Sequence, residues 1–273
     1  HAARLSGGRA GRVPARGRDP FAVPGADLYS PAPAAMFTDL HCHLLHQFDD
    51  GAADAGEAVE MARALVSVGF GAAAPSPHAG RSYPGAEAAQ ARLGELAQVL
   101  EREGVALQLH AGAENYLDAE FLEHELAGRG RHIASGPWVL VELPYQTVMP
   151  ALTEVLFQLR RKAIRPLIAH PERCAHFHEP GAAEAAVQAG AALQLNLGSL
   201  WGRYGRGVRK HAARLLEAGL YAVAASDLHH AEDAGRWLEK ALRELEKEAG
   251  VPAVRRLLEV NPARIVRGEE LVE

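Results

Sequence analysis

The sequence predicts an α/β protein in which parallel strands alternate with helices around one barrel. Seven short apolar runs have the composition of strands, and the segments between them repeat apolar residues at helical spacing. Strands joined by helices of this length form parallel βαβ units, and seven such strands favour a closed or nearly closed barrel over an open sheet. A chain of 273 residues fits a single domain of this kind.

The expected elements follow one another in strict alternation along the chain. The expected strands are Met36–Leu44, Gly71–Ser76, Val105–His110, Trp138–Leu143, Pro166–His170, Ala192–Leu197 and Tyr221–Ser226. The expected helices are Ala55–Val68, Ala86–Glu103, Asp118–Ala127, Pro150–Lys162, Ala182–Ala189 and Gly207–Ala218, with Gly235–Ala249 and Pro252–Leu258 after the last strand.

The first 35 residues differ in composition from the rest of the chain. Residues 1–35 are rich in Gly, Ala, Pro and Arg without apolar periodicity, so we expect a disordered or loosely attached arm before a domain of residues 36–273. With 48% hydrophobic residues and a net charge of −5, the chain can bury a core and shows no preference for nucleic acid. Two isolated cysteines and no long apolar segment predict a cytoplasmic protein without membrane insertion.

Polar side chains terminate the apolar strands. Because strand side chains alternate between faces, His41 and His43 project together at the end of the first strand, and the same spacing recurs in Asp227 and His229. The other strand ends carry His78, Glu114, Glu142 and His170. The carboxyl ends of barrel strands converge on one face, which predicts a cluster of metal ligands there.

Each of these residues could instead be a structural residue that makes hydrogen bonds and binds no metal. That interpretation fits poorly for Glu142, because an ionised carboxylate inside an apolar run costs several kcal/mol, as an order of magnitude, unless a cation or partner compensates it. We expect the remaining histidines to be surface or structural residues: His1, His46, His110, His124, His132, His176, His178, His211 and His230.

Taken in order, these motifs resemble a known superfamily. They are His-Cys-His at 41–43, Asp-Asp-Gly at 49–51, Pro-His at 77–78, Gly-Ala-Glu at 112–114, Val-Glu-Leu at 141–143, Ala-His-Pro-Glu-Arg at 169–173 and Ser-Asp-Leu-His at 226–229. The set closely resembles the polymerase-and-histidinol-phosphatase (PHP) superfamily. Within it, the chain is similar to the bacterial manganese-dependent protein-tyrosine phosphatases of capsule and exopolysaccharide systems, from Met36 to about Val266.

The resemblance implies a distorted seven-stranded, TIM-like barrel that binds three metal ions. It assigns the ligands to the ions as follows: His41, His43, Glu114 and Asp227 to the first; Glu114, Glu142 and His170 to the second, with Glu114 bridging; Asp50, His78 and His229 to the third. Glu114, His170 and Arg173 are the implied catalytic residues, and Arg173 matches an arginine that contacts the substrate phosphate. Arg236 is a candidate for a second phosphate contact, although the segment that precedes it differs in length from the family pattern.

The ligand types indicate the chemistry. Imidazole and carboxylate without thiolate suit Mn²⁺, Fe²⁺ or Zn²⁺, and we expect two to three divalent ions, most readily Mn²⁺. A bridging carboxylate places two ions about 3.5–4 Å apart, where they activate a shared water and clamp an in-line phosphoryl displacement. The nucleophile would be a metal-bound hydroxide, and the implied substrate is a phosphotyrosyl protein such as the tyrosine-rich tail of a bacterial tyrosine kinase.

The spacing of the sequence motifs excludes other phosphatase mechanisms. A cysteine-dependent tyrosine phosphatase needs an arginine six positions after the cysteine, but Phe48 follows Cys42 and Pro180 follows Cys174 at that distance. The sequence also lacks a Gly-x-Ser-x-Gly elbow and a P-loop. Two alternatives remain: a small-molecule phosphatase, such as one acting on histidinol phosphate, and a non-catalytic binding protein stabilised by metal.

Overall fold

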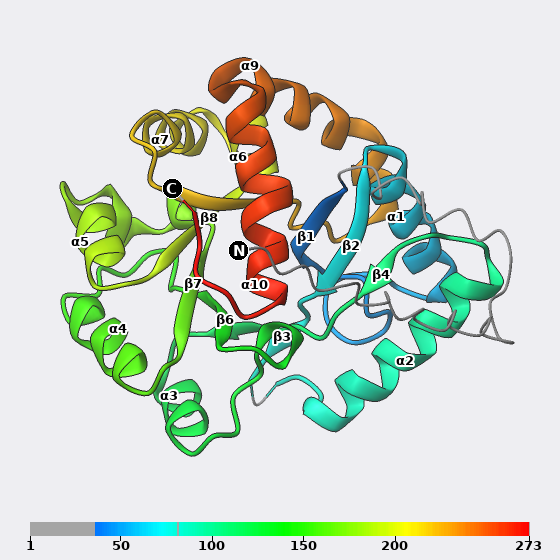
Figure 1. Ribbon diagram of the computed structural model, residues 1–273, viewed down its shortest axis with the longest axis horizontal. Coiled ribbons are helices and arrows are strands. Elements are labelled where there is room, and N and C mark those ends of the chain that lie inside the picture. Colours follow the sequence, from blue (N-terminus) through cyan, green and yellow to red (C-terminus); the bar gives the residue numbers. More distant parts are fainter. Residues whose placement is uncertain (1–35, 81, 273) are drawn as a thin grey trace, which may run out of the picture. The chain divides into compact units, whose positions relative to one another are not determined.

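Parallel strands surrounded by helices form the core of the protein (Figure 1). The structure is a computed structural model that describes residues 36–80 and 82–272, so the expected arm of residues 1–35 lies outside the described residues. The strands are β1 Phe37–Cys42, β2 Phe70–Pro75, β3 His78–Ala79, β4 Gln108–Leu109, β5 Glu114–Tyr116, β6 Trp138–Glu142, β7 Arg165–Ala169, β8 Ala192–Asn196 and β9 Tyr221–Ala225. Their order is β1-β2-β4 in one sheet and β3-β5-β6-β7-β8-β9 in the other.

The nine described strands of the two sheets occupy seven positions around the barrel, because two positions hold two short strands each. β2 and β3 follow each other after Ser76-Pro77, and β4 and β5 are separated by only four residues. β2 pairs with β4, and β3 pairs with β5. β2 and β3 therefore form one interrupted strand, and β4 and β5 form its interrupted neighbour. The first and last positions meet where the His43 N–H donates to the Leu228 carbonyl at 2.8 Å and the Asp227 N–H to the His41 carbonyl at 2.7 Å. The predicted seven-stranded α/β fold is confirmed.

The interruptions correct one sequence prediction. The expected strand Val105–His110 is reduced to Gln108–Leu109, and β3 and β5 were not predicted. Pro75 and Pro77 cannot donate to a ladder, which explains why β2 stops between them.

Helices connect the strands and cover their outer faces (Figure 1). They are α1 Ala55–Ser67, α2 Ala86–Arg102, α3 Ala119–Leu126, α4 Leu152–Arg161, α5 Ala182–Gln188, α6 Leu197–Trp201, α7 Arg206–Glu217, α8 Ala231–Asp233, α9 Glu239–Arg255 and α10 Asn261–Val266. The unpredicted α6 follows β8 directly because the Asn196 carboxamide oxygen accepts the N–H groups of Gly198 and Ser199. None of the helices within residues 36–80 and 82–272 has the length and apolarity to cross a membrane.

Strand side chains divide the core into two layers. In β6, Val139 and Val141 belong to the large outer core, whereas Trp138 and Leu140 belong to a second cluster that includes Ile265. Ile265 lies on α10, which crosses one end of the barrel in Figure 1. α10 therefore packs at the amino ends of the strands and leaves their carboxyl ends to the functional site.

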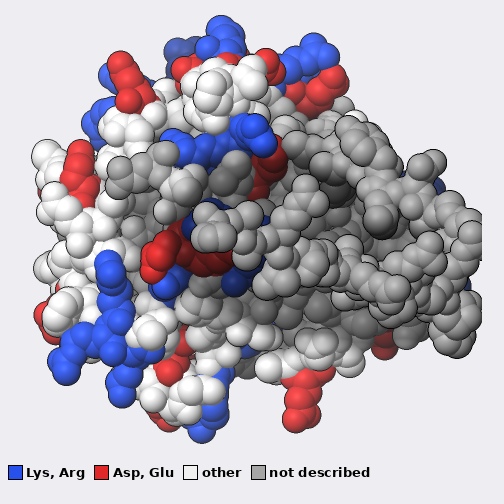
Figure 2. Space-filling model, in the orientation of Figure 1, with Lys and Arg blue, Asp and Glu red and all other residues white. Residues whose placement is uncertain are grey.

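Surface charge is mixed on the face shown in Figure 2. Basic side chains gather there over the end of α4, where Arg160, Arg161 and Lys162 are exposed, and acidic side chains are interspersed elsewhere. This face has no uniform field of one sign, in keeping with the small net charge of −5.

The close approach of the two interrupted strands predicts a cost for any side chain at Gly112. An added Cβ there would lie 2.8 Å from the Pro75 carbonyl oxygen, so Gly112→Ala should destabilise the protein by about 1–3 kcal/mol. Gly94→Ala is the control, because the exposed Gly94 on α2 has nothing within 4 Å of such a Cβ and should gain about 0.5–1 kcal/mol. Urea unfolding of both variants tests this, and equal effects would contradict the strand packing.

Candidate metal centre

The structure brings all nine predicted metal ligands to the carboxyl end of the barrel. His41 lies on β1, His78 on β3, Glu114 on β5 and Glu142 on β6, and His43, Asp50, His170, Asp227 and His229 lie in the segments that follow strands. Six of the nine are buried, namely His41, His43, Glu114, Glu142, His170 and Asp227, whereas His78 and His229 are partly accessible and Asp50 is exposed. The site is therefore deep on one side and open on the other.

A buried carboxylate stands at the centre of the cluster. The Oε1 atom of Glu114 lies 3.3 Å from Nε2 of His41 and 3.0 Å from Nε2 of His170. Its Oε2 atom lies 3.1 Å from Nδ1 of His78. Glu114 therefore contacts imidazoles from three strand ends, which is the geometry of a bridging ligand.

The first two histidines point at one shared position. Nδ1 of His41 lies 3.0 Å from the Gln194 side-chain oxygen and Nδ1 of His43 lies 2.7 Å from Asp49. These acceptors place a proton on each Nδ1, which leaves the two Nε2 atoms facing each other at 3.4 Å. Once Nε2 of His41 has lost its proton, a cation between the two nitrogens, beside Asp227, would bind both.

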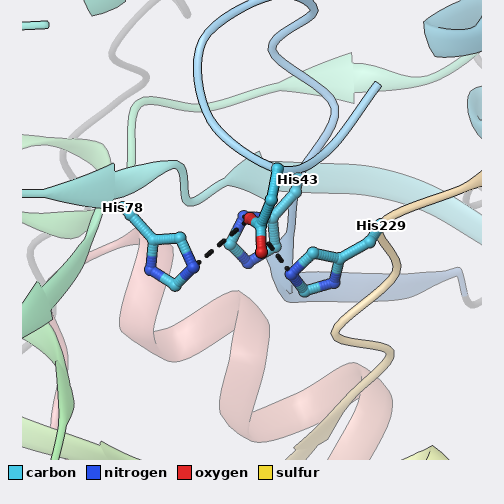
Figure 3. A group of neighbouring side chains, drawn as sticks. His43, His78 and His229 are labelled. Carbon is cyan, nitrogen blue, oxygen red and sulfur yellow. Dashed lines mark ion pairs between the residues drawn. The ribbon is translucent and has the colours of Figure 1, made fainter. Parts of the chain in front are cut away.

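A second set of side chains converges at the accessible side. Oδ1 of Asp50 lies 3.4 Å from Nε2 of His78 and 3.5 Å from Nε2 of His229. Figure 3 shows the rings of His43, His78 and His229 gathered around one point, with His43 between the other two. His43 therefore approaches both sets of ligands.

The donor atoms fit divalent cations. Four groups have ligand atoms within 4.8 Å of one another: His43, Asp50, His78 and His229; His41, Glu114 and His170; His41, His43 and Asp227; His78, Glu114 and Glu142. Nδ1 of His170 is buried and has no hydrogen-bond partner within the described residues, so this nitrogen is left for a cation or a hydrogen-bond donor. The sharing of His41, His43 and His78 between groups differs from the assignment that the resemblance implied, although the nine residues are the same.

Residues that orient the ligands were missed at the sequence level. Asp49 accepts from His43 and from the His78 backbone N–H at 2.9 Å, and Gln194 holds His41. The Asn196 amide donates to Oδ2 of Asp227 at 2.6 Å. Two amides at alternate positions of the otherwise apolar β8 are the signal that could have identified Gln194 and Asn196.

The backbone is strained at two of the ligands. His170 has a φ of 33° and Asp227 a φ of 53°, both in the left-handed region that disfavours side chains other than glycine. Close packing also restricts Gly51, where a Cβ would lie 2.2 Å from the His43 carbonyl oxygen. These constraints aim the ligand side chains at the shared cluster.

Arg173 lies beside the ligands, as expected. Its Nη1 donates to Oδ2 of Asp227 at 3.0 Å, and its Cζ lies 4.7 Å from the ring centre of Tyr145 and 4.1 Å from that of Tyr204. The two rings and the carboxylate fix the guanidinium at the edge of the cluster.

A cleft of about 620 Å³ opens over the ligands. Its polar and aromatic lining includes Arg173, Arg203, His230, Tyr83, Tyr116, Tyr145 and Tyr204. Arg236 does not line the cleft. Its side chain is 67% exposed and pairs with Glu232. It points outward because the next residue in the same helical turn, Trp237, is buried. This corrects the expected position of Arg236, while His230, expected to be structural, borders the cleft.

The charges of the cluster predict that metal binding displaces protons. Burial lowers the pKa of His41, but Glu114 and Asp227 raise it to about 10; burial also lowers the pKa of His78, but hydrogen bonds to Asp50 and Glu114 raise it to about 11. Both imidazoles are therefore protonated at neutral pH before a cation binds, and ligands must be deprotonated to bind one.

Mn²⁺ binding at neutral pH should therefore release protons, and the apparent affinity should rise with pH. Calorimetric titration in buffers of different ionisation enthalpy measures this release. An observed binding enthalpy independent of the buffer would contradict the assignment of His41 and His78 as ligands.

Known proteins share this architecture. A family model described as "Capsular polysaccharide synthesis, CpsB/CapC" matches residues 37–267. The chain is 34% identical to the tyrosine-protein phosphatase YwqE of Bacillus subtilis, over 78% of this chain and 85% of the relative, and 26% identical to the putative tyrosine-protein phosphatase CapC of Staphylococcus aureus, over 70% and 76%.

A solved structure extends the similarity to the fold. It comes from a study of YwqE from Bacillus subtilis and CpsB from Streptococcus pneumoniae, described as unique metal-dependent tyrosine phosphatases. It aligns with a TM-score of 0.79 and 31% identity over 86% of this chain and 96% of the other. The protein therefore belongs to the CpsB/CapC family of capsular polysaccharide synthesis proteins.

Proposed function

We propose that this protein is a metal-dependent phosphatase that hydrolyses phosphotyrosine in proteins. The observation that carries the proposal is one cleft lined by seven of the nine candidate metal ligands, Arg173 and four tyrosine rings, with His41 and His43 buried in the same ligand cluster. Divalent ions held there would lower the pKa of a water molecule and neutralise the charge of a phosphoryl group. The names of the relatives in Bacillus subtilis and Staphylococcus aureus support the same activity.

The side chains of the cleft divide the work of substrate binding. Arg173 gives one N–H to Asp227 and keeps further donors for phosphate oxygens, in the planar arrangement that suits a phosphate. Tyr83 and Tyr116, 38% and 43% exposed, offer aromatic surface for the ring of a phosphotyrosine. Burial raises the pKa of Tyr145, so its phenol stays protonated beside Glu142.

The finer assignments complete the proposal. Mn²⁺ is the proposed native metal, supported by the mixed imidazole and carboxylate donors, with Fe²⁺ or Zn²⁺ as substitutes. The proposed substrate is the tyrosine-rich tail of a bacterial tyrosine kinase in the cytoplasm, supported by membership of a capsular polysaccharide synthesis family. Regulation of exopolysaccharide synthesis is the corresponding biological role.

Hydrolysis assays test the activity and its two alternatives. With added Mn²⁺ the protein should hydrolyse a phosphotyrosyl peptide faster than histidinol phosphate, and a chelator should abolish this activity. Glu114→Gln and His170→Ala should remove turnover, because both side chains belong to the ligand groups, whereas His124→Ala, at an exposed position on α3, should have little effect. Preference for histidinol phosphate would favour the small-molecule alternative, and metal binding without any hydrolysis would favour the binding protein.

Arg173 provides a separate test of the mechanism. Arg173→Ala removes a donor whose contact strengthens as charge develops on the phosphoryl group, so kcat should fall about 100- to 1,000-fold. Arg173→Lys should recover only part of this, because an ammonium group lacks the planar fork. Since Arg173 also contacts Asp227, metal content must be measured in the same samples. Full metal occupancy with an unchanged kcat/KM for an aryl phosphate would remove Arg173 from the mechanism.

A further inference from the structure

A second arginine borders the cleft at a position that the sequence motifs do not include. Arg173 and Arg203 are the two Lys or Arg side chains that line the cleft within the described residues. Arg203 follows α6 in the short turn before α7, and its side chain is 32% exposed.

Contacts on three sides hold the Arg203 guanidinium in place. Nη2 of Arg203 donates to Oδ2 of Asp233 at 2.6 Å. Its Cζ lies 5.5 Å from the ring centre of Trp237 and 5.9 Å from that of Tyr204. The Tyr204 ring is also the one that lies 4.1 Å from the Cζ of Arg173, so one aromatic side chain contacts both guanidinium groups.

The Arg203 guanidinium retains donors for a ligand. A guanidinium has five N–H groups, and the bond to Asp233 is its one hydrogen bond to a partner in residues 36–80 and 82–272. Burial lowers the pKa of Arg203, but the hydrogen bond to Asp233 and the negative charges of Asp233 and Asp227 raise it overall. Asp227 belongs to a metal-ligand group, so the charge of Arg203 acts on the same region as the proposed ions.

We propose that Arg203 is the second arginine that binds the substrate phosphate, the role that the resemblance assigned to Arg236. This inference rests on the proposed phosphatase function. A phosphate monoester dianion has three terminal oxygens, and a second fixed guanidinium facing the cleft offers charge-assisted hydrogen bonds to it. Arg236 is exposed, pairs with Glu232 and does not line the cleft.

The test compares arginine variants on two substrates that share only a phosphorylated ring. The substrates are p-nitrophenyl phosphate and a phosphotyrosyl peptide with acidic flanking residues, assayed with metal-loaded protein. Arg203→Met should lower kcat/KM about 10- to 100-fold on both substrates and weaken inhibition by inorganic phosphate by a similar factor. Arg203→Lys should recover part of both effects, with metal content unchanged.

Two further variants serve as controls. Arg243→Met changes an arginine that is 76% exposed and paired with Glu239 four residues away, so it should leave all values within about twofold. Arg236→Met tests the rival position directly. A loss in Arg236→Met with none in Arg203→Met overturns the proposal, and so does a loss in Arg203→Met confined to the acidic peptide, which would mean that Arg203 binds flanking residues.

Binding measurements keep the inference separable from the proposed function. If Arg203→Met loses metal or unfolds, Arg203→Lys at full metal occupancy decides, because it must still bind inorganic phosphate more weakly than the parent. If the parent protein hydrolyses no phosphotyrosine, the proposed function fails, whereas calorimetry with inorganic phosphate still tests Arg203. Equal phosphate affinity of the parent and Arg203→Lys would overturn the assignment of Arg203.

Discussion

A buried carboxylate surrounded by imidazoles is the constraint on which the arrangement of the barrel depends. Glu114 is 2% exposed, and an ionised carboxylate at such depth is costly unless positive groups compensate it. His41, His78 and His170 supply that compensation from β1, β3 and the end of β7. The register of β3 and β5 places His78 opposite Glu114, so the interruption of β2 after Pro75 positions a ligand as well as ending a strand.

Protons hold the positions that divalent cations would take in this cluster. Without a cation, the raised pKa values of His41 and His78 keep protons between the imidazoles and the carboxylates. A cation would replace those protons and bind the same oxygens and nitrogens, whose positions are already set in the folded chain. Left-handed backbone at His170 and Asp227 costs about 1–3 kcal/mol each, and the surrounding hydrogen bonds must hold it.

The sequence predicted the ligands better than the groups around them, for a geometric reason. Alternation along a strand and the convergence of parallel strand ends are local rules, so His41, His43 and their partners could be grouped without knowing any contact. The alternating amides of Gln194 and Asn196 stand out in an apolar strand, but the sequence could not show their partners, because these are His41 on β1 and Asp227 after β9. α6 has five residues, too few for a periodic pattern. The interruption between β4 and β5 could not be predicted either, because it depends on the close approach of Gly112 to Pro75 on the neighbouring strand.

The positions of the arginines depend on turns rather than on strand rules. Arg203 is carried by a turn between Gly202 and Gly205, which have φ values of 99° and 95°, and Arg236 is directed outward by the burial of its neighbour Trp237. A turn tolerates changes in length that a paired strand does not. The positions of arginines on turns can therefore change without moving the candidate metal ligands at the strand ends. A change in the length of the segment after Ser226-Asp227-Leu228-His229 can therefore carry one arginine away from the cleft. Tyr204 contacts the two guanidinium groups that do line the cleft and holds them beside the ligand cluster.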